Sequence, residues 1–167
     1  ADTEHEIYLQ PDLGVNPFGT TVLEVWTGDM QYWQPTWEGR DGVWPLSGAI
    51  EIDIFNNDVQ NEYKEIWLQI TWQPQAQGNE PAISLLDASG QPFANTSSDP
   101  TEVNPIGPFD WVHSTFHLFI YPNPDFETIR IDGGINIDEI VVDTICIPEP
   151  ATMAFLCAGA ILLRRRK

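Results

Sequence analysis

The stretch Ile66-Trp67-Leu68-Gln69-Ile70-Thr71-Trp72 decides the fold class of this chain. Alternate side chains of an extended strand point to opposite faces, so this stretch has one wholly apolar face: Ile66, Leu68, Ile70 and Trp72. The other face is mixed and carries Trp67, Gln69 and Thr71. A period of two residues predicts a β-strand with at least one buried face.

The same period recurs along the chain. Three isoleucines alternate with Glu51 and Asp53 in 50–54, and large apolar residues fill every even position of 116–121. Further strands are predicted, between segments rich in Pro, Gly, Asn and Asp, at 5–10, 20–26, 82–86, 126–131 and 135–145. About eight strands with no helical period predict an all-β, antiparallel two-sheet sandwich, and we expect a jelly roll.

Two local signals refine this prediction. Asp132-Gly133-Gly134 lies between two predicted strands and is typical of a hairpin turn. In the last strand Ile135 and Ile137 are out of phase with Ile140 and Val142, so we predict a β-bulge near Asp138-Glu139.

The last twenty residues have a different character. Pro148-Glu149-Pro150 precedes thirteen uncharged residues, 151–163, and the chain ends in Arg164-Arg165-Arg166-Lys167. Thirteen helical residues span roughly 20 Å, less than the roughly 30 Å hydrocarbon core of a membrane. We therefore predict a short apolar helix that inserts transiently. The cations stay on the cytoplasmic side, and the prolines keep an extended junction on the other.

This order resembles the PEP-CTERM tail that exosortases recognise in exported proteins of bacteria that make exopolysaccharide. The resemblance covers residues 148–167. It implies a sorting signal formed by Pro148, Glu149, Pro150, Arg164, Arg165 and Arg166, an exosortase-type partner, and removal of the tail. Residues 1–147 would then be an exported domain, released or held at the cell surface. Ala1 to Glu6 contain no export signal, so we expect that one has been removed. The alternatives are a tail anchor or a buried helix.

Charge and cysteine content restrict the partners of residues 1–147. They hold 3 of the 7 cations and 24 of the 25 anions, a net charge of −21. Such a surface disfavours nucleic acid and favours solubility outside the cell. Cys146 and Cys157 lie on opposite sides of the predicted cleavage junction, so they do not form a disulfide framework for the domain.

Aromatic residues suggest a glycan partner. Trp26, Trp33, Trp37 and Trp44, with Tyr32, crowd a stretch rich in Gly and Pro that we interpret as loop. Exposed rings stack on the apolar faces of sugars, so Trp33, Trp37 and Trp44 are candidate ligands for an exopolysaccharide or surface glycan. The alternative is that these rings cap the core. The ending 137–142 resembles the closing strand of galactose-binding-like carbohydrate modules.

Catalytic and metal-binding patterns are incomplete. The segment from Trp44 to Asn56 resembles the active-site strand of laminarinase-type β-glucanases, which implies Glu51 as nucleophile and Asp53 as its assisting carboxylate. Asn56 stands where that family has its acid/base glutamate, and an amide cannot donate the proton. We therefore expect no enzyme. His113 and His117 are roughly 13 Å apart on a strand, too far to share one ion.

A structural Ca²⁺ site is the one cofactor that the sequence suggests. Asp138 and Glu139 at the predicted bulge supply hard oxygen ligands, and Glu4 or Glu6 could complete the site. The alternative is solvated surface carboxylates. Taken together, the sequence predicts a non-enzymatic exported surface or matrix protein with a structural or adhesive role. The alternatives are a carbohydrate-binding module and a glucanase-like hydrolase.

Overall fold

The computed structural model describes residues 5–9, 16–27, 33–56, 59, 61–94 and 99–148, without the side chains of 5–9 and 27. The predicted apolar helix at 151–163 lies outside these residues, as does the sorting signal apart from Pro148. Every regular element in the described ranges is a β-strand. They contain no helix long and apolar enough to cross a membrane.

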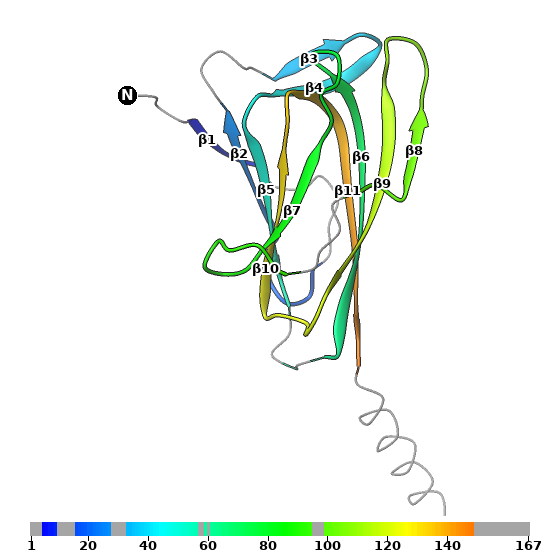
Figure 1. The fold of residues 1–167 in the computed structure, drawn as a ribbon. Coiled ribbons are helices and arrows are strands. Elements are labelled where there is room, and N and C mark those ends of the chain that lie inside the picture. The colour runs from blue at the N-terminus through cyan, green and yellow to red at the C-terminus, as the bar shows by residue number, and fades with distance from the viewer. Residues whose placement is uncertain are drawn as a thin grey trace, which may run out of the picture.

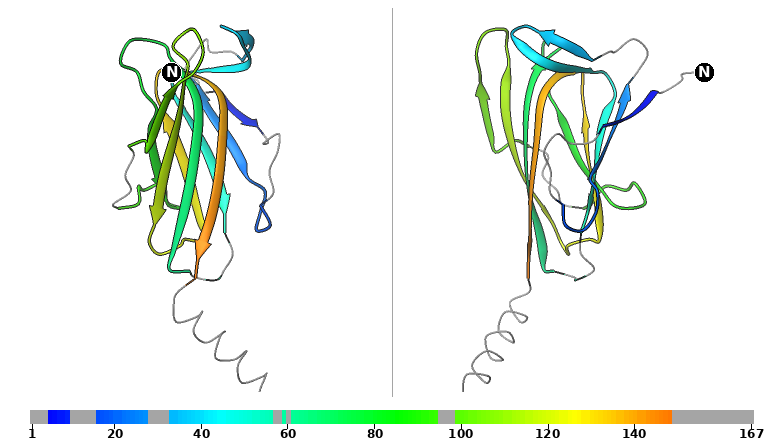
Figure 2. Two further views of the ribbon diagram at one scale, coloured as in Figure 1. Left: turned by 90° about the vertical axis from the view of Figure 1, so that its right-hand side faces the viewer. Right: turned by 180° about the vertical axis from the view of Figure 1, so that it is seen from behind.

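The strands form two antiparallel sheets that face each other, which confirms the all-β, two-sheet prediction (Figures 1 and 2). The five-stranded sheet has the order β1 (His5–Leu9), β2 (Val22–Thr27), β5 (Ala49–Phe55), β10 (Phe126–Asp132) and β7 (Ala82–Leu86). The six-stranded sheet has the order β3 (Gln34–Trp37), β4 (Arg40–Leu46), β11 (Ile135–Ile147), β6 (Tyr63–Pro74), β9 (Val112–Ile120) and β8 (Glu102–Pro105).

The core lies between the sheets and follows the period of two. On β6 the four residues that the alternation assigns to one face are all buried, and they pack with alternating isoleucines of β5 and β10. Burial of such aliphatic side chains is worth about 1.5–3 kcal/mol each, so this layer is the main source of stability. Thr71, on the opposite face of β6, is buried as well.

The stretch between Trp26 and Pro45 contains more strand than predicted. It includes the hairpin β3–β4, which turns at Glu38 and Gly39 with positive φ angles of 45° and 81°. The interpretation of this stretch as loop was wrong for 34–37 and 40–46. Its Gly and Pro residues suggested a loop, but those in 35–45 lie in the turn of the hairpin and in short strands that pair over only a few residues. Strand β8 was also not predicted; all four of its residues are exposed, so it lacks a buried face to show in the sequence.

One of the two local predictions is wrong and the other is confirmed. Asp132-Gly133-Gly134 is not a hairpin turn, because β10 and β11 belong to different sheets. The Gly134 carbonyl accepts hydrogen bonds from Gln75 N at 3.0 Å and Asn79 Nδ2 at 2.9 Å, so the β6–β7 connection, not a partner strand, satisfies it. The bulge is present as a register shift between Ile137 and Glu139.

The end of β11 marks the edge of the sandwich. Ile147 pairs with Tyr63 of β6, and its carbonyl accepts a hydrogen bond from Glu62 N at 2.9 Å. Pro148 follows directly and is exposed. Figure 1 shows this end opposite the β3–β4 hairpin.

Candidate functional site

The three candidate tryptophans do not form one surface. Trp44 on β4 is buried in the core, whereas the side chains of Trp33 and Trp37 are 52% and 41% exposed. The Trp33 ring lies 6.1 Å from the Trp44 ring at an angle of 48°. Trp37 Nε1 donates to Gln73 Oε1 at 3.0 Å, which ties the hairpin to β6. Tyr32 lies outside the described residues.

The carboxylates of the glucanase-like motif are held by neighbours on the outer face of the five-stranded sheet. Glu51 accepts hydrogen bonds from Arg130 Nη1 at 2.6 Å and Trp26 Nε1 at 3.1 Å. Asp53 accepts one from Thr128 Oγ1 at 2.8 Å. Asn56 follows β5 and has the parity of its core face, so its side chain is separated from the other two.

The two histidines make separate contacts along β9. His113 Nδ1 lies 3.1 Å from Thr71 Oγ1, and His117 Nε2 lies 3.1 Å from Glu65 Oε2. Within the described ranges, no group of three or more His, Cys, Asp or Glu side chains is arranged to hold a metal ion.

Asp138, at the bulge, is paired with a cation of the protein itself. Arg40 Nη1 lies 3.0 Å from Asp138 Oδ2, while Glu139 is exposed. Partial burial raises the pKa of Asp138 against the lowering effect of Arg40. Glu6 belongs to the edge strand of the other sheet, and Glu4 lies outside the described residues.

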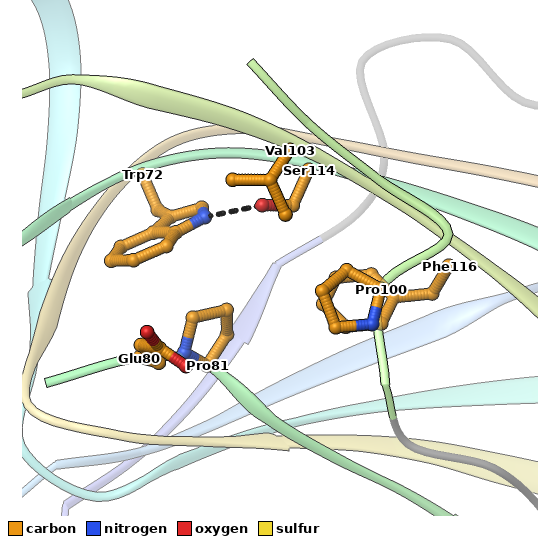
Figure 3. Close-up of a pocket in the computed structure, with 7 residues that line it drawn as sticks. All are labelled: Trp72, Glu80, Pro81, Pro100, Val103, Ser114 and Phe116. Carbon is orange, nitrogen blue, oxygen red and sulfur yellow. Dashed lines mark hydrogen bonds between the residues drawn. The ribbon is translucent and has the colours of Figure 1, made fainter. Parts of the chain in front are cut away.

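A small hollow beside β8 is too small for a sugar (Figure 3). Its lining consists of Trp72, Glu80, Pro81, Pro100, Val103, Ser114 and Phe116. Its volume of about 60 Å³ is far below the roughly 300 Å³ or more of ligand pockets. The Trp72 indole already donates to Ser114 Oγ at 3.0 Å.

The strongest candidate surface lies on the outer face of the six-stranded sheet. Five rings from β6, from β9 and from the residue that directly follows β9 form what we call the aromatic platform: Tyr63, Trp67, His117, Phe119 and Tyr121. Figure 2, left, shows β9, β6 and β11 side by side, with the outer face of this sheet toward the viewer.

Cross-strand pairing brings the platform rings together. Trp67 stands opposite His117 in the register, and their rings stack at 4.6 Å with an angle of 16°. The His117 and Phe119 rings are 4.4 Å apart, and the Tyr63 and Tyr121 rings stack at 5.1 Å. These contacts hold the side chains in place before any ligand arrives.

The platform is accessible and continues onto β11. Tyr121 is 65% exposed, and the next strand adds the exposed Val141 and Ile145. Desolvation, followed by the charges of Glu65 and Tyr121 and a hydrogen bond with Glu65, raises the pKa of Tyr63. A surface that combines partly exposed rings with exposed aliphatic side chains is typical of an interaction surface.

The platform offers no free cation. Residues 1–147 contain only Arg40, Lys64 and Arg130 as cations, and the structure describes all three. Arg40 pairs with Asp138, and Lys64 pairs with Glu127. Arg130 pairs with both Glu51 and Asp132. An acidic ligand therefore finds no unpaired positive side chain on this domain.

Comparisons with known proteins identify no relative: no protein-family model, curated protein or solved structure matches this chain.

Proposed function

We propose that this protein is an exported surface or matrix protein whose sandwich adheres to a neutral polysaccharide through the aromatic platform. The single observation that carries the proposal is the row of neighbouring rings on the outer face of β6 and β9, which are partly exposed and end at the exposed Tyr121. Sugar rings present apolar C–H faces that pack against aromatic rings, and preordered rings lose little entropy on binding.

The dimensions of the platform suit an extended chain. His117, Phe119 and Tyr121 are alternate residues, so along the strand they cover about 13 Å. Trp67 and Tyr63 widen the surface across to β6. An elongated surface of this kind favours the side of a polymer over a buried single sugar.

Charge supports a neutral ligand over an acidic one. The domain carries a net charge of −21, and its three cations are all engaged in ion pairs. An anionic polymer would be repelled without compensation, whereas a neutral polymer binds through ring contacts and hydrogen bonds. The proposal requires no metal ion: Arg40 already neutralises Asp138.

The tail supports export. The order Pro-Glu-Pro, apolar run and basic cluster remains the basis for proposing sorting by an exosortase-type enzyme, with transient membrane insertion and cleavage near Pro148. The finer fold proposal, a jelly roll, rests on connectivity. From β4 onward every connection except β8–β9 passes from one sheet to the other.

A second candidate glycan surface is formed by Trp33 and Trp37, which are exposed at the end of the sandwich opposite the end of β11.

We assign no catalytic role to the domain. What supports this is that Arg130 and Trp26 hold Glu51 and that Asn56 lies on the other side of its sheet. Release of reducing sugar from a β-glucan, lost in Glu51→Gln, would overturn it.

The test of adhesion is retention of the purified protein on insoluble polysaccharides, neutral and acidic, at low and high salt. We expect retention on at least one neutral polymer with little effect of salt, because no ion pair contributes. Retention only on acidic polymers, or its loss in salt, would overturn the proposal.

Sorting is tested separately by the intact mass of the protein from its native cells. We expect the mass of a chain that ends near Pro148–Pro150, and the mass of a chain that extends through Lys167 would contradict sorting with cleavage.

A further inference from the structure

Three polar side chains meet inside the core, near the end of the sandwich where β11 stops. Lys64 on β6 and Glu127 on β10 are both fully buried, and Asn56 follows β5 directly. Lys64 belongs to the six-stranded sheet, whereas Glu127 and β5 belong to the other. The group therefore joins the two sheets through the core.

The contacts arrange these groups around the Asn56 amide. Lys64 Nζ donates to Asn56 Oδ1 at 2.6 Å and pairs with Glu127 Oε1. The second carboxylate oxygen, Glu127 Oε2, accepts a hydrogen bond from Asn56 Nδ2. One carboxylate thus contacts both nitrogens, one through each oxygen.

The amide is also fixed from its other side. Asn56 Nδ2 donates to the Pro124 carbonyl at 2.7 Å, and Asn56 N donates to the Asp125 carbonyl at 2.9 Å. Since a C=O bond is about 1.23 Å long, Lys64 Nζ lies at most about 3.8 Å from Asn56 Cγ. This upper bound is close to the about 3–3.5 Å at which reacting atoms are positioned for attack.

We propose that Lys64 and Asn56 form an intramolecular isopeptide bond, with Glu127 as the catalytic base and acid. This inference is independent of the proposed glycan binding. It uses residues on the core side of both sheets, away from the platform.

The chemistry needs no reagent from outside the protein. Lys64 first gives a proton to Glu127, which leaves a neutral amine and a neutral acid. The amine lone pair forms a bond to Asn56 Cγ, and the carbonyl π pair moves to Oδ1. When the carbonyl reforms, the bond from Cγ to Nδ2 breaks. Glu127 protonates the departing nitrogen and takes up the proton released from Nζ. The products are one secondary amide, one ammonia and a neutral Glu127.

Burial favours this reaction. Desolvation makes buried charges unfavourable, and the bond removes both charges from the core. Desolvation raises the pKa of Glu127 despite the opposing effect of Lys64, which favours the proton transfer. Cys146 stands opposite Lys64 in the register, but burial raises the pKa of its thiol, so it stays protonated and does not compete.

Peptide mapping of the full chain tests the proposal. Trypsin cleaves after Lys and Arg, and Lys64 is the only such residue between Arg40 and Arg130. We expect protein held folded at neutral pH until its mass is constant to resist cleavage at Lys64. It should yield peptide 41–130 lighter by one ammonia, about 17 Da. Glu127→Gln should restore the full mass and the cleavage, whereas the matched variant Glu65→Gln, on the outer face of β6, should keep the bond.

Each alternative outcome has a distinct signature. A wild-type chain with full mass and normal cleavage after Lys64 overturns the proposal without any variant. Ammonia loss with normal cleavage at Lys64 and sensitivity to hydroxylamine would indicate a succinimide at Asn56, which also overturns it. Persistence of the bond in Glu127→Gln overturns the role of Glu127. Fragment spectra that join residues around 56 and 64 support the bond.

Discussion

Trp67→Ala removes the central ring of the aromatic platform, and its effect on glycan binding can be worked out from the structure. The indole stacks on His117 at 4.6 Å and is partly exposed on the outer face of the sheet. An aromatic stacking contact contributes about 0.5–1.5 kcal/mol, and 1.4 kcal/mol corresponds to a tenfold change in Kd. We therefore expect Trp67→Ala to weaken binding to the retained polysaccharide by about 2- to 12-fold.

The same substitution should leave the fold intact. Trp67 is only partly buried, and the cross-strand pair with His117 is worth about 0.2–1 kcal/mol. For a domain of this size, 1 kcal/mol lowers Tm by about 2–4 °C. A fall of a few degrees is thus expected, far from unfolding. Trp33→Ala is the matched control, because it removes an exposed tryptophan at the opposite end of the sandwich.

The assay is a binding isotherm on the polysaccharide that retains the wild-type protein, with Tm measured on the same samples. Wild-type affinity in Trp67→Ala, together with a large loss in Trp33→Ala, would refute the platform and move the site to the β3–β4 hairpin. Loss of affinity in both variants, with Tm lowered by no more than a few degrees in either, would mean that both surfaces contact the polymer.

Three further predictions concern the fold and its thiol. Phe116→Ala, at a core position that is 1% exposed, should lower the free energy of unfolding in urea by about 3–5 kcal/mol; a loss below 1 kcal/mol would contradict the assigned core. Gly42→Ala and its control Gly90→Ala share positive φ angles of 80° and 75° and a backbone cost of roughly 1–2 kcal/mol. Only Gly42→Ala also meets an obstacle, the Trp33 ring 2.8 Å from the added carbon, so it should be the more destabilising in the same urea titration. Alkylation of Cys146, followed in its own peptide, should be slower in the folded than in the unfolded chain near pH 8.5, because burial raises the pKa of the thiol and the thiolate is the reactive form. In the folded chain the rate should rise only at higher pH. Equal rates in the two states would refute this.

Hydrophobic period predicted the strands wherever one face is buried. The alternation around Ile66 and the isoleucines of β5 fixed the faces correctly, and the phase break near Asp138 located the bulge. The hairpin at Gly133 was predicted wrongly because a Gly-Gly turn permits a sharp reversal without specifying which sheet receives the next strand. That choice depends on β4 and β6, which flank β11 and are distant in sequence.

Only part of the aromatic platform could be predicted from the sequence. The period that buries Phe116 and Leu118 also turns His117, Phe119 and Tyr121 to the opposite face of the strand, and the same reasoning applies to Trp67. These residues were therefore assignable to outer faces. Their proximity was not, because it depends on β6 pairing with β9 in one register, and a shift by one residue would turn the rings inward.

For Lys64, Asn56 and Glu127, too, the sequence predicts which face each residue lies on but not which residues it meets. Extended by one step, the core face of β6 reaches Lys64, that of β5 reaches Asn56, and that of β10 reaches Glu127. Three separate periods thus each direct a polar residue toward the interior, where a polar group without a partner costs free energy. The sequence therefore shows that three polar residues need partners in the core. They obtain partners only if the three residues meet. Meeting requires the end of β5, the start of β6 and the start of β10 to lie at the same end of the sandwich, which the strand order provides. If the isopeptide bond forms, the conflict is removed by chemistry, because the two buried charges are lost with the ammonia.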